Sequence, residues 1–155
     1  MLIAQLSDIH TGGGRSQQAL LDAATAEINQ ARPDLVVVAG DDTDDGDPDQ
    51  FEEAKERLDT LDCPNLVIVP GNHDARHVGY IQYEETFGPR DSRLRLGSDG
   101  VDVALVAVDS SKPDLDQGGV GREHYGWIEE GFRGDADLRR EVLALRQQQL
   151  EGLAD

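Results

Sequence analysis

The sequence predicts an α/β fold, and three short apolar runs carry most of this prediction. Residues 2–6, 35–39 and 66–69 are rich in Leu, Ile and Val, and loop-forming residues follow each of them. Runs of this kind are typical of buried strands. The segments between them have apolar residues at helical spacing. An order of strand, helix, strand, helix, strand implies parallel strands that right-handed crossovers connect.

The first half of the chain has the clearest elements. A helix is predicted over residues 16–31, and Pro33 ends it. The continuous apolar run 35–39 indicates a strand that is covered on both faces. A carboxylate-rich loop over residues 40–49 follows. The next predicted helix, over residues 48–61, has Phe51, Ala54, Leu58 and Leu61 on one face.

The second half predicts shorter elements. We expect a helix over residues 80–87, an edge strand over 93–96, a hairpin turn over 98–100, a strand over 101–108, a polar loop over 110–121 and a helix over 123–132. The tail from 136 to 153 predicts one more helix, because Leu138, Val142, Leu145 and Leu150 recur at helical spacing.

The composition excludes one class of function. The chain has 155 residues, enough for one domain with a core, and a net charge of −18. So acidic a chain does not bind nucleic acid by electrostatics, since phosphate contacts need Lys and Arg. The heavy carboxylate bias favours a halophilic surface that stays soluble at high salt. An ordinary acidic cytosolic protein is the alternative.

The location expected from the sequence is cytoplasmic. Cys63 is the only cysteine, so no disulfide can form within the chain and a reducing compartment is compatible. The start of the chain has no signal-peptide pattern. No apolar stretch approaches the ~20 residues that a membrane helix needs, and no membrane partner is expected.

Polar residues follow each of the first three predicted strands. Asp8 and His10 come after the first, Asp41 after the second, and Asn72 after the third, where it begins the run Asn72-His73-Asp74. Parallel neighbouring strands place these loops at one edge of the sheet, where α/β proteins bind ligands. Carboxylate, amide and imidazole donors suit Mn, Fe, Zn or Ni. A bridging carboxylate can hold two ions ~3.5–4 Å apart, as in two-metal hydrolytic sites.

Each motif taken alone can also be explained without a functional role. Asp-x-His, and Gly-Asp after an apolar strand, are common by chance. Gly-Asn-His-Asp is more specific, because no structural requirement places an imidazole directly after a turn asparagine. The three motifs in this order, each after a strand, favour the metal site.

The motifs resemble those of a known family. Asp8-Ile9-His10, Gly40-Asp41-Asp42-Thr43-Asp44 and Gly71-Asn72-His73-Asp74 are similar to the first three motifs of the calcineurin-like metallophosphoesterases. The segments 5–10 and 31–38 are similar to the branch that contains cyclic-nucleotide phosphodiesterases. The resemblance is dense over residues 1–74 and thinner to about residue 132. It implies a metallo-dependent phosphatase-like α-β-β-α four-layer sandwich with two divalent metal ions.

The resemblance also implies roles for individual residues. Asp8 and His10 would hold the first metal ion, Asp41 would bridge both ions, and Asn72 would bind the second. The activity implied is hydrolysis of phosphomonoesters or phosphodiesters, with a small phosphate ester or a nucleotide as substrate.

Two further residues would be catalytic by the same resemblance. His73 would lie near the leaving-group oxygen and protonate it or stabilise its charge, and Asp74 would orient the imidazole.

The sequence departs from the family pattern in its second half. The family has later histidines, after a strand and in a Gly-His-x-His turn, and this sequence has neither pattern. Of its other histidines, His77 and His124 are weak candidates for substitutes. Asp42 stands where an apolar residue is usual.

We therefore interpret residues 1–155 as a single domain that lacks the C-terminal part of the family fold, with the motifs in 1–74 and an atypical helical tail over 136–155. Activity of this chain alone is doubtful. The alternative is a catalytically silent module from a truncated gene that binds metal or a partner. A missing second sheet would leave an apolar sheet face or edge exposed and favour self-association.

Overall fold

The first sheet contains three parallel strands. The computed structural model describes residues 1–14, 18–98, 100–133 and 140–144, with the backbone alone for residues 98 and 140–144. Strands β1 (Ile3–Leu6), β2 (Leu35–Ala39) and β3 (Leu66–Val69) lie side by side in that order. Leu6 pairs with Val38, and Ala39 with Val69. All three predicted strands are confirmed, and β2 is buried along its whole length.

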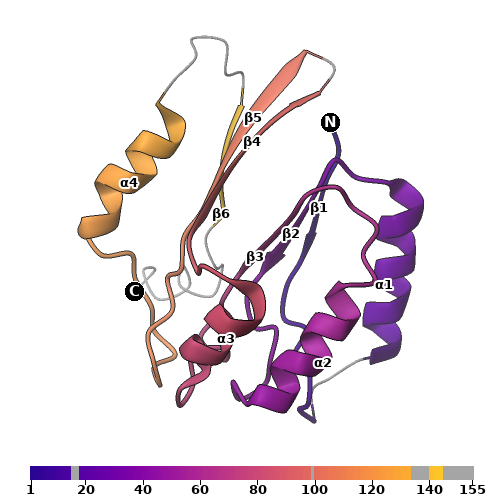
Figure 1. Cartoon of the computed structure of the whole chain (residues 1–155), viewed down its shortest axis with the longest axis vertical. Helices are drawn as coiled ribbons and strands as arrows, with labels where there is room; N and C mark the ends of the chain where they lie inside the picture. Colours follow the sequence, from indigo (N-terminus) through magenta and orange to yellow (C-terminus); the bar gives the residue numbers. More distant parts are fainter. Residues whose placement is uncertain (15–17, 99, 134–139, 145–155) are drawn as a thin grey trace, which may run out of the picture.

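Three helices belong to this part of the chain. They are α1 (Gln18–Ala31), α2 (Pro48–Leu58) and α3 (Gly79–Phe87). Pro48 is well placed in the first turn of α2, where its missing N–H would have no helical partner. The helix ends three residues before the predicted Leu61. Figure 1 shows α1 and α2 along the same side of the first sheet.

A second sheet contains β4 (Ser92–Ser98), β5 (Val101–Ala107) and β6 (Arg140–Ala144), in the order β4-β5-β6. β4 and β5 are antiparallel, and Ser98 pairs with Val101, as the predicted hairpin requires. Part of that hairpin turn, Asp99, lies outside the described residues. Helix α4 (Glu123–Phe132) has the predicted bounds.

The predicted helix over residues 136–153 is wrong where the structure describes it. Residues 140–144 form β6, which pairs in parallel with β5, so that Val103 lies opposite Arg140 and Ala107 opposite Ala144. The spacing of the apolar residues predicted a helix, but pairing with a buried strand decides the outcome. The rest of that prediction lies outside the described residues.

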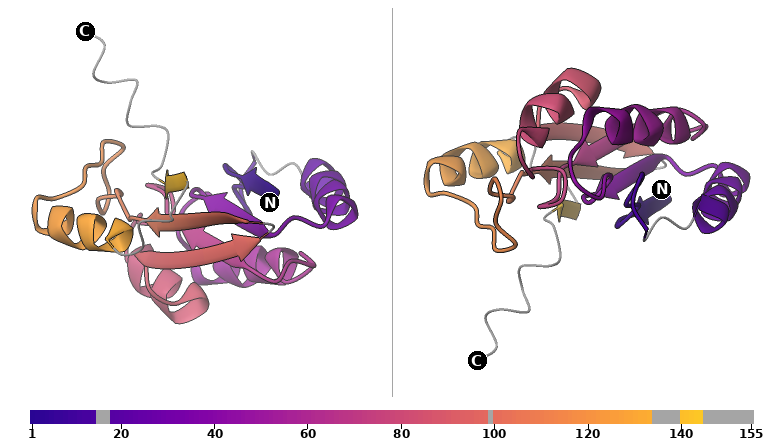
Figure 2. Two further views of the ribbon diagram at one scale, coloured as in Figure 1. Left: turned by 90° about the horizontal axis from the view of Figure 1, so that it is seen from above. Right: turned by 90° about the horizontal axis from the view of Figure 1, so that it is seen from below.

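The two sheets pack face to face between helices, as the α-β-β-α prediction requires (Figure 1). In Figure 2, α4 and α1 lie at opposite sides of the molecule with the strands between them. Alternation along β2 divides the core, since side chains of a strand point to opposite faces in turn. Leu35 and Val37 belong to the cluster that includes Leu105 of β5. Val36 and Val38 belong to the cluster that includes Leu58 of α2.

The expectation of an uncovered sheet face is corrected by this packing. The second sheet covers the inner face of the first sheet, because Leu94, Leu96 and Leu105 pack on that face. The apolar side chains of this sheet that remain exposed are on its outer strands, and they include Ile3 of β1 and Leu66 of β3. No helix in the described part of the chain is long and apolar enough to cross a membrane.

Candidate metal centre

Backbone hydrogen bonds join the loops after β1 and β2. The amide of Asp8 donates to the carbonyl of Gly40 at 3.0 Å, and the amide of His10 donates to the carbonyl of Asp41 at 2.9 Å. Thr11 continues this pattern with Asp42. The register of the two strands therefore extends past their ends. The predicted ligands are held by paired backbone rather than by independent loops.

The backbone is unusual at three predicted ligands. Asp8, His10 and Asp41 have φ angles of 57°, 50° and 56°, in the left-handed region. L-residues avoid this region because of steric contact, at about 1–2 kcal/mol each. Residues held there often occur at functional sites, where surrounding structure fixes them.

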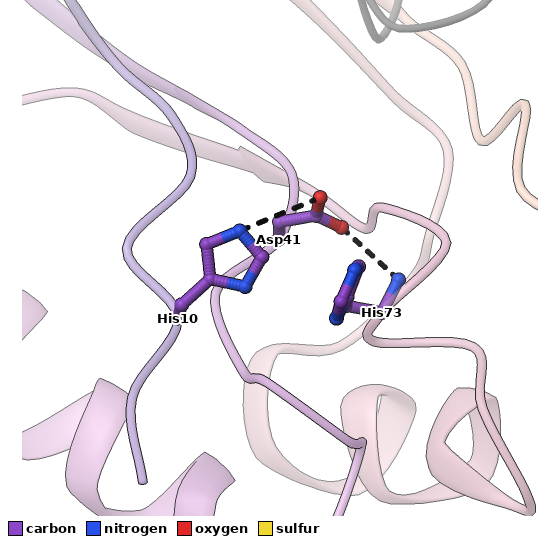
Figure 3. A group of neighbouring side chains, drawn as sticks. All are labelled: His10, Asp41 and His73. Carbon is purple, nitrogen blue, oxygen red and sulfur yellow. Dashed lines mark hydrogen bonds and ion pairs between the residues drawn. The ribbon is translucent and has the colours of Figure 1, made fainter. Parts of the chain in front are cut away.

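A compact group of possible metal ligands lies at this edge of the sheet. His10, Asp41 and His73 are buried, and each offers a ligand atom within 4.8 Å of those of the other two. Nε2 of His10 lies 3.9 Å from Oδ2 of Asp41 and 3.9 Å from Oδ1 of Asp8. Figure 3 shows the Asp41 carboxylate beside the two imidazoles, whose ring centroids lie 4.6 Å apart in an edge-to-face arrangement. Imidazole and carboxylate donors fit a first-row divalent metal ion.

Asp41 is the centre of this group. Its carboxylate is fully buried, and Oδ1 accepts a hydrogen bond of 3.0 Å from the amide of His73. Gly71 lies directly against it, and a Cβ at this glycine would collide with the Asp41 carboxylate and amide. The need for glycine at position 71 is therefore one of space, since the exit from β3 does not require a positive φ there.

Asn72 is buried beside the group. Its Nδ2 donates to Oδ1 of Asp116 at 3.2 Å, which ties the end of β3 to the loop after β5. The sequence did not single out Asp116, because nothing local connects it with residue 72. The bond fixes the orientation of the amide that was predicted to bind the second metal ion.

The carboxylate of Asp74 is fully buried between two loops. Its carboxylate accepts hydrogen bonds from the amides of Gly71 and Thr43, at 2.7 and 2.8 Å, and from the hydroxyl of Thr43. A longer bond of 3.2 Å comes from the amide of Asp42. Burial raises the pKa of the Asp74 carboxyl, and the backbone hydrogen bonds oppose this shift. Asp74 thus joins the loops after β2 and β3, and these contacts do not include the His73 imidazole.

Asp44 contacts both imidazoles. Its Oδ1 lies 3.2 Å from Nδ1 of His10, and its backbone carbonyl contacts Nδ1 of His73. A carboxylate or carbonyl partner on the second nitrogen commonly orients a metal-binding histidine. Asp44 closes the Gly-Asp-x-x-Asp motif, so the sequence contained a signal for it. Arg76, whose Nη2 lies 3.2 Å from Nε2 of His73, had no such signal.

The other two histidines lie outside the group. Nδ1 of His77 contacts the carbonyl of Asp45 at 3.3 Å. Nε2 of His124, on α4, lies 3.4 Å from Oδ2 of Asp91. Neither belongs to the metal-ligand group found among the described residues.

A cavity of about 360 Å³ adjoins the group on the side of Asn72. Its lining is formed by Asp45, Asn72, Arg76, His77, Asp114, Leu115 and Asp116. A larger cavity, of about 640 Å³, lies at the end of β5 beside Arg90, Asp109, Lys112 and His124. We assign the candidate site by the ligand geometry, which the larger cavity does not share.

Comparison with known proteins agrees with this geometry. The model of the family described as calcineurin-like phosphoesterase matches residues 1–146. The chain is 29% identical over 139 residues to a probable glycerophosphodiester phosphodiesterase GpdQ of Arcobacter nitrofigilis, and 30% identical over 145 residues to GpdQ of Enterobacter lignolyticus. Each alignment covers 83% of this chain and 50% of the relative.

A shorter similarity points to the same group of proteins. A probable cyclic nucleotide phosphodiesterase of a Synechococcus strain is 34% identical over 80 residues, which cover 46% of this chain and 31% of that protein. The chain spans about half the length of the first curated relatives that it matches. Because the family model matches nearly the whole chain, the protein belongs to the calcineurin-like phosphoesterase family.

Proposed function

We propose that this chain contributes to a metal-dependent phosphoesterase that hydrolyses phosphodiesters. The observation that supports this most is the convergence of His10, Asp41 and His73 from three neighbouring parallel strands. The relatives are named as phosphodiesterases of glycerophosphodiesters and cyclic nucleotides. The proposed substrate class is therefore a small phosphate diester, including nucleotides.

The proposed metal ligands are Asp8, His10, Asp41 and Asn72, with Asp41 shared by two divalent ions of the Mn, Fe, Zn or Ni class. Such ions lower the pKa of a bound water and neutralise charge on the phosphoryl group. The half-exposed Asp8 and the buried Asp41 lie on either side of Nε2 of His10, which supports this assignment.

The chain's own residues would position the groups that surround the reacting phosphorus. The Asp44 carboxylate lies 3.2 Å from Nδ1 of His10, and Nε2 of the same ring lies 3.9 Å from the carboxylates of Asp8 and Asp41. Asp41 fixes the backbone of His73. We propose that His73 lies on the leaving-group side of the phosphorus and stabilises the charge that develops there.

Hydrolysis of bis(p-nitrophenyl) phosphate with Mn²⁺ tests the proposal. We expect metal-dependent turnover that Asp41→Asn and His73→Ala reduce by at least about 100-fold, since both would remove groups at the reacting centre. Asp109→Asn, a carboxylate at the end of β5, is the matched control. Metal-independent turnover, or turnover that survives Asp41→Asn, would contradict the proposal.

A second candidate is a catalytically silent module that binds metal or a partner. Two imidazoles are close together at the site, whereas His77 and His124 lie elsewhere, and the chain spans half of its relatives. Mn²⁺ binding without turnover, together with the mass of a dimer in light scattering, would favour this candidate. An active monomer would exclude it.

The composition of the chain supports two further proposals. We infer a surface adapted to high salt from the net charge of −18. The single cysteine, Cys63, is compatible with the reducing cytoplasm that we propose as the location. Unfolding measured with rising KCl tests the surface: stability should increase as salt screens the repulsion between carboxylates. A protein that loses stability with added KCl would contradict this.

A further inference from the structure

Arg76 lies next to the imidazole of His73. The two residues share a turn, since the amide of Arg76 donates to the carbonyl of His73 at 3.2 Å. Nη2 of Arg76 lies 3.2 Å from Nε2 of His73. The Arg76 side chain is 31% exposed and lines the cavity that also contains Asn72. A permanent positive charge is therefore accessible at the edge of the metal-ligand group.

The contacts of His73 determine which nitrogen carries the hydrogen. Nδ1 faces the backbone carbonyl of Asp44, which can only accept, so Nδ1 must donate. Nε2 faces a guanidinium, which can only donate, so Nε2 must accept. In this arrangement Arg76 is the hydrogen-bond donor of the Arg76–His73 pair, and Nε2 of His73 is the acceptor.

The charges around Arg76 show what it would bring to an anionic substrate. The carboxylates of Asp8 and Asp41 each lie 3.9 Å from Nε2 of His10, and the Asp44 carboxylate lies 3.2 Å from Nδ1 of the same imidazole. Asp45 pairs with Arg76 itself. A phosphodiester is repelled by such groups unless cations compensate them. Metal ions would supply part of this compensation, and Nη2 of the Arg76 guanidinium would add a charged donor for the phosphoryl oxygens.

We propose that Arg76 is a substrate-binding residue of this site and donates hydrogen bonds to the non-bridging oxygens of the phosphoryl group. The inference rests on the proposed phosphoesterase function and names a residue that the metal motifs do not contain. The same nitrogen that contacts Nε2 of His73 turns to the phosphoryl group when substrate enters from the cavity beside Asn72. Nε2 of His73 then loses this contact and can carry a proton towards the leaving-group oxygen, as proposed above.

A structural role is the competing explanation. Nη1 of Arg76 donates to Oδ1 of Asp45 at 2.8 Å and to the carbonyl of Asp44 at 2.9 Å. These bonds would clamp the loop after β2 to the loop after β3. The Asp45 side chain is 48% exposed, and exposed ion pairs contribute little to stability. Variants of Arg76 and of Asp45 can therefore distinguish a substrate-binding role from a structural role.

The experiment compares both partners with inorganic phosphate as the probe. The full chain is loaded with Mn²⁺, and phosphate binding is measured by calorimetry for the parent, Arg76→Ala, Arg76→Lys and Asp45→Asn. We expect Arg76→Ala to weaken phosphate binding by about 10- to 100-fold, as for a lost charge-assisted pair of bonds. Arg76→Lys should recover part of the loss. Asp45→Asn should bind phosphate as tightly as the parent or more tightly.

Mn²⁺ affinity should stay the same in all four proteins, because Arg76 and Asp45 are not proposed ligands. Equal weakening by Arg76→Ala and Asp45→Asn would show a clamp and overturn the proposal. Phosphate binding unchanged in Arg76→Ala, or absent in the parent, would also overturn it.

Failure of the proposed function has a different signature. If phosphate binding depends on Arg76 but bis(p-nitrophenyl) phosphate is not hydrolysed, the Arg76 assignment holds and hydrolysis by this chain is refuted. If hydrolysis occurs and Arg76→Ala leaves kcat/KM unchanged, the function holds and the Arg76 assignment is refuted. Exposed Arg133, which pairs with Glu129 on α4, supplies the matched control Arg133→Ala.

Discussion

The strand ends of the two sheets hold their carboxylates in opposite ways. At the end of β5, Asp109 pairs with Arg90 at 2.8 Å and accepts hydrogen bonds from Ser111. At the ends of β1 and β2, Asp8 and Asp41 face the imidazole of His10 instead. The first arrangement is complete within the chain. The second has two carboxylates that face one imidazole, and an added cation would compensate their charge if the proposed metal ions bind there.

The largest expected effect is the loss of unfolding free energy when the buried carboxylate of Asp74, which joins two loops, is removed. Asp74→Ala leaves the amides of Gly71, Thr43 and Asp42 without this acceptor, and we expect a loss of about 3 kcal/mol or more in unfolding free energy. Asp109→Ala should lose about 1–2 kcal/mol, because Arg90 and Ser111 are closer to solvent. Urea denaturation measures both. Equal losses would remove the distinction between the two strand ends.

The metal affinity should separate buried from exposed ligands. Asp41 is fully buried beside the imidazoles, whereas the Asp8 side chain is 49% exposed. We expect Asp41→Asn to weaken Mn²⁺ binding by about 100-fold, or about 2.7 kcal/mol, and Asp8→Asn by about 10-fold. Titration calorimetry measures this, with Asp109→Asn as the control that keeps the parent's affinity. A larger effect for Asp8 would place the ion outside the group in Figure 3.

Two glycines on α4 test how tightly the second sheet is covered. A Cβ at Gly131 would collide with Val106 of β5, whereas a Cβ at Gly126 would meet nothing within 4 Å. Gly131→Ala should therefore destabilise the protein by about 2 kcal/mol through overpacking. Gly126→Ala should stabilise it by about 0.5–1 kcal/mol through helix propensity. Thermal unfolding should shift in opposite directions, and a common direction would mean that α4 does not pack on β5 as described.

The smallest effect concerns pH. Burial raises the pKa of the Asp109 carboxyl above its ordinary value of 3.8, and Ser111 and Arg90 oppose the shift. The folded protein therefore binds the Asp109 proton more tightly than the unfolded chain does. The stability that this protonation contributes is present at low pH, and it is lost as the pH rises through the pKa of the folded state. In Asp109→Asn the side chain at this position no longer binds a proton over this pH range. This variant's unfolding free energy relative to the parent should rise from about pH 4 to about pH 7, and a constant difference would contradict the assignment.

Local sequence signals predicted the parts of the molecule that depend on local physics. The run at 35–39 became a strand because an apolar β-branched segment can be buried on both faces. Parallel strands brought His10 and Asp41 together because their ends meet at one edge. The acceptor role of Asp74 depends on Thr43, 31 residues away, and a single sequence contains no signal for such pairing.

The same reason explains the wrong prediction for residues 140–144. Their apolar spacing fits a helix, and only the buried neighbour β5 makes them a strand. Arg76 was missed because one arginine in a loop has no pattern. Its side chain folds back onto His73 within one turn after β3, and it also reaches the carbonyl of Asp44 in the loop after β2.

The left-handed backbone at Asp8, His10 and Asp41 has a consequence for how this chain would change under selection. Glycine adopts such φ angles without penalty. At Asp8, whose side chain is 49% exposed, a glycine would relieve about 1 kcal/mol of strain while it deletes a proposed metal ligand. At Asp41 a glycine would also remove the acceptor of the His73 amide, and this loss outweighs the strain that is relieved. Selection for stability alone would therefore replace Asp8 before Asp41.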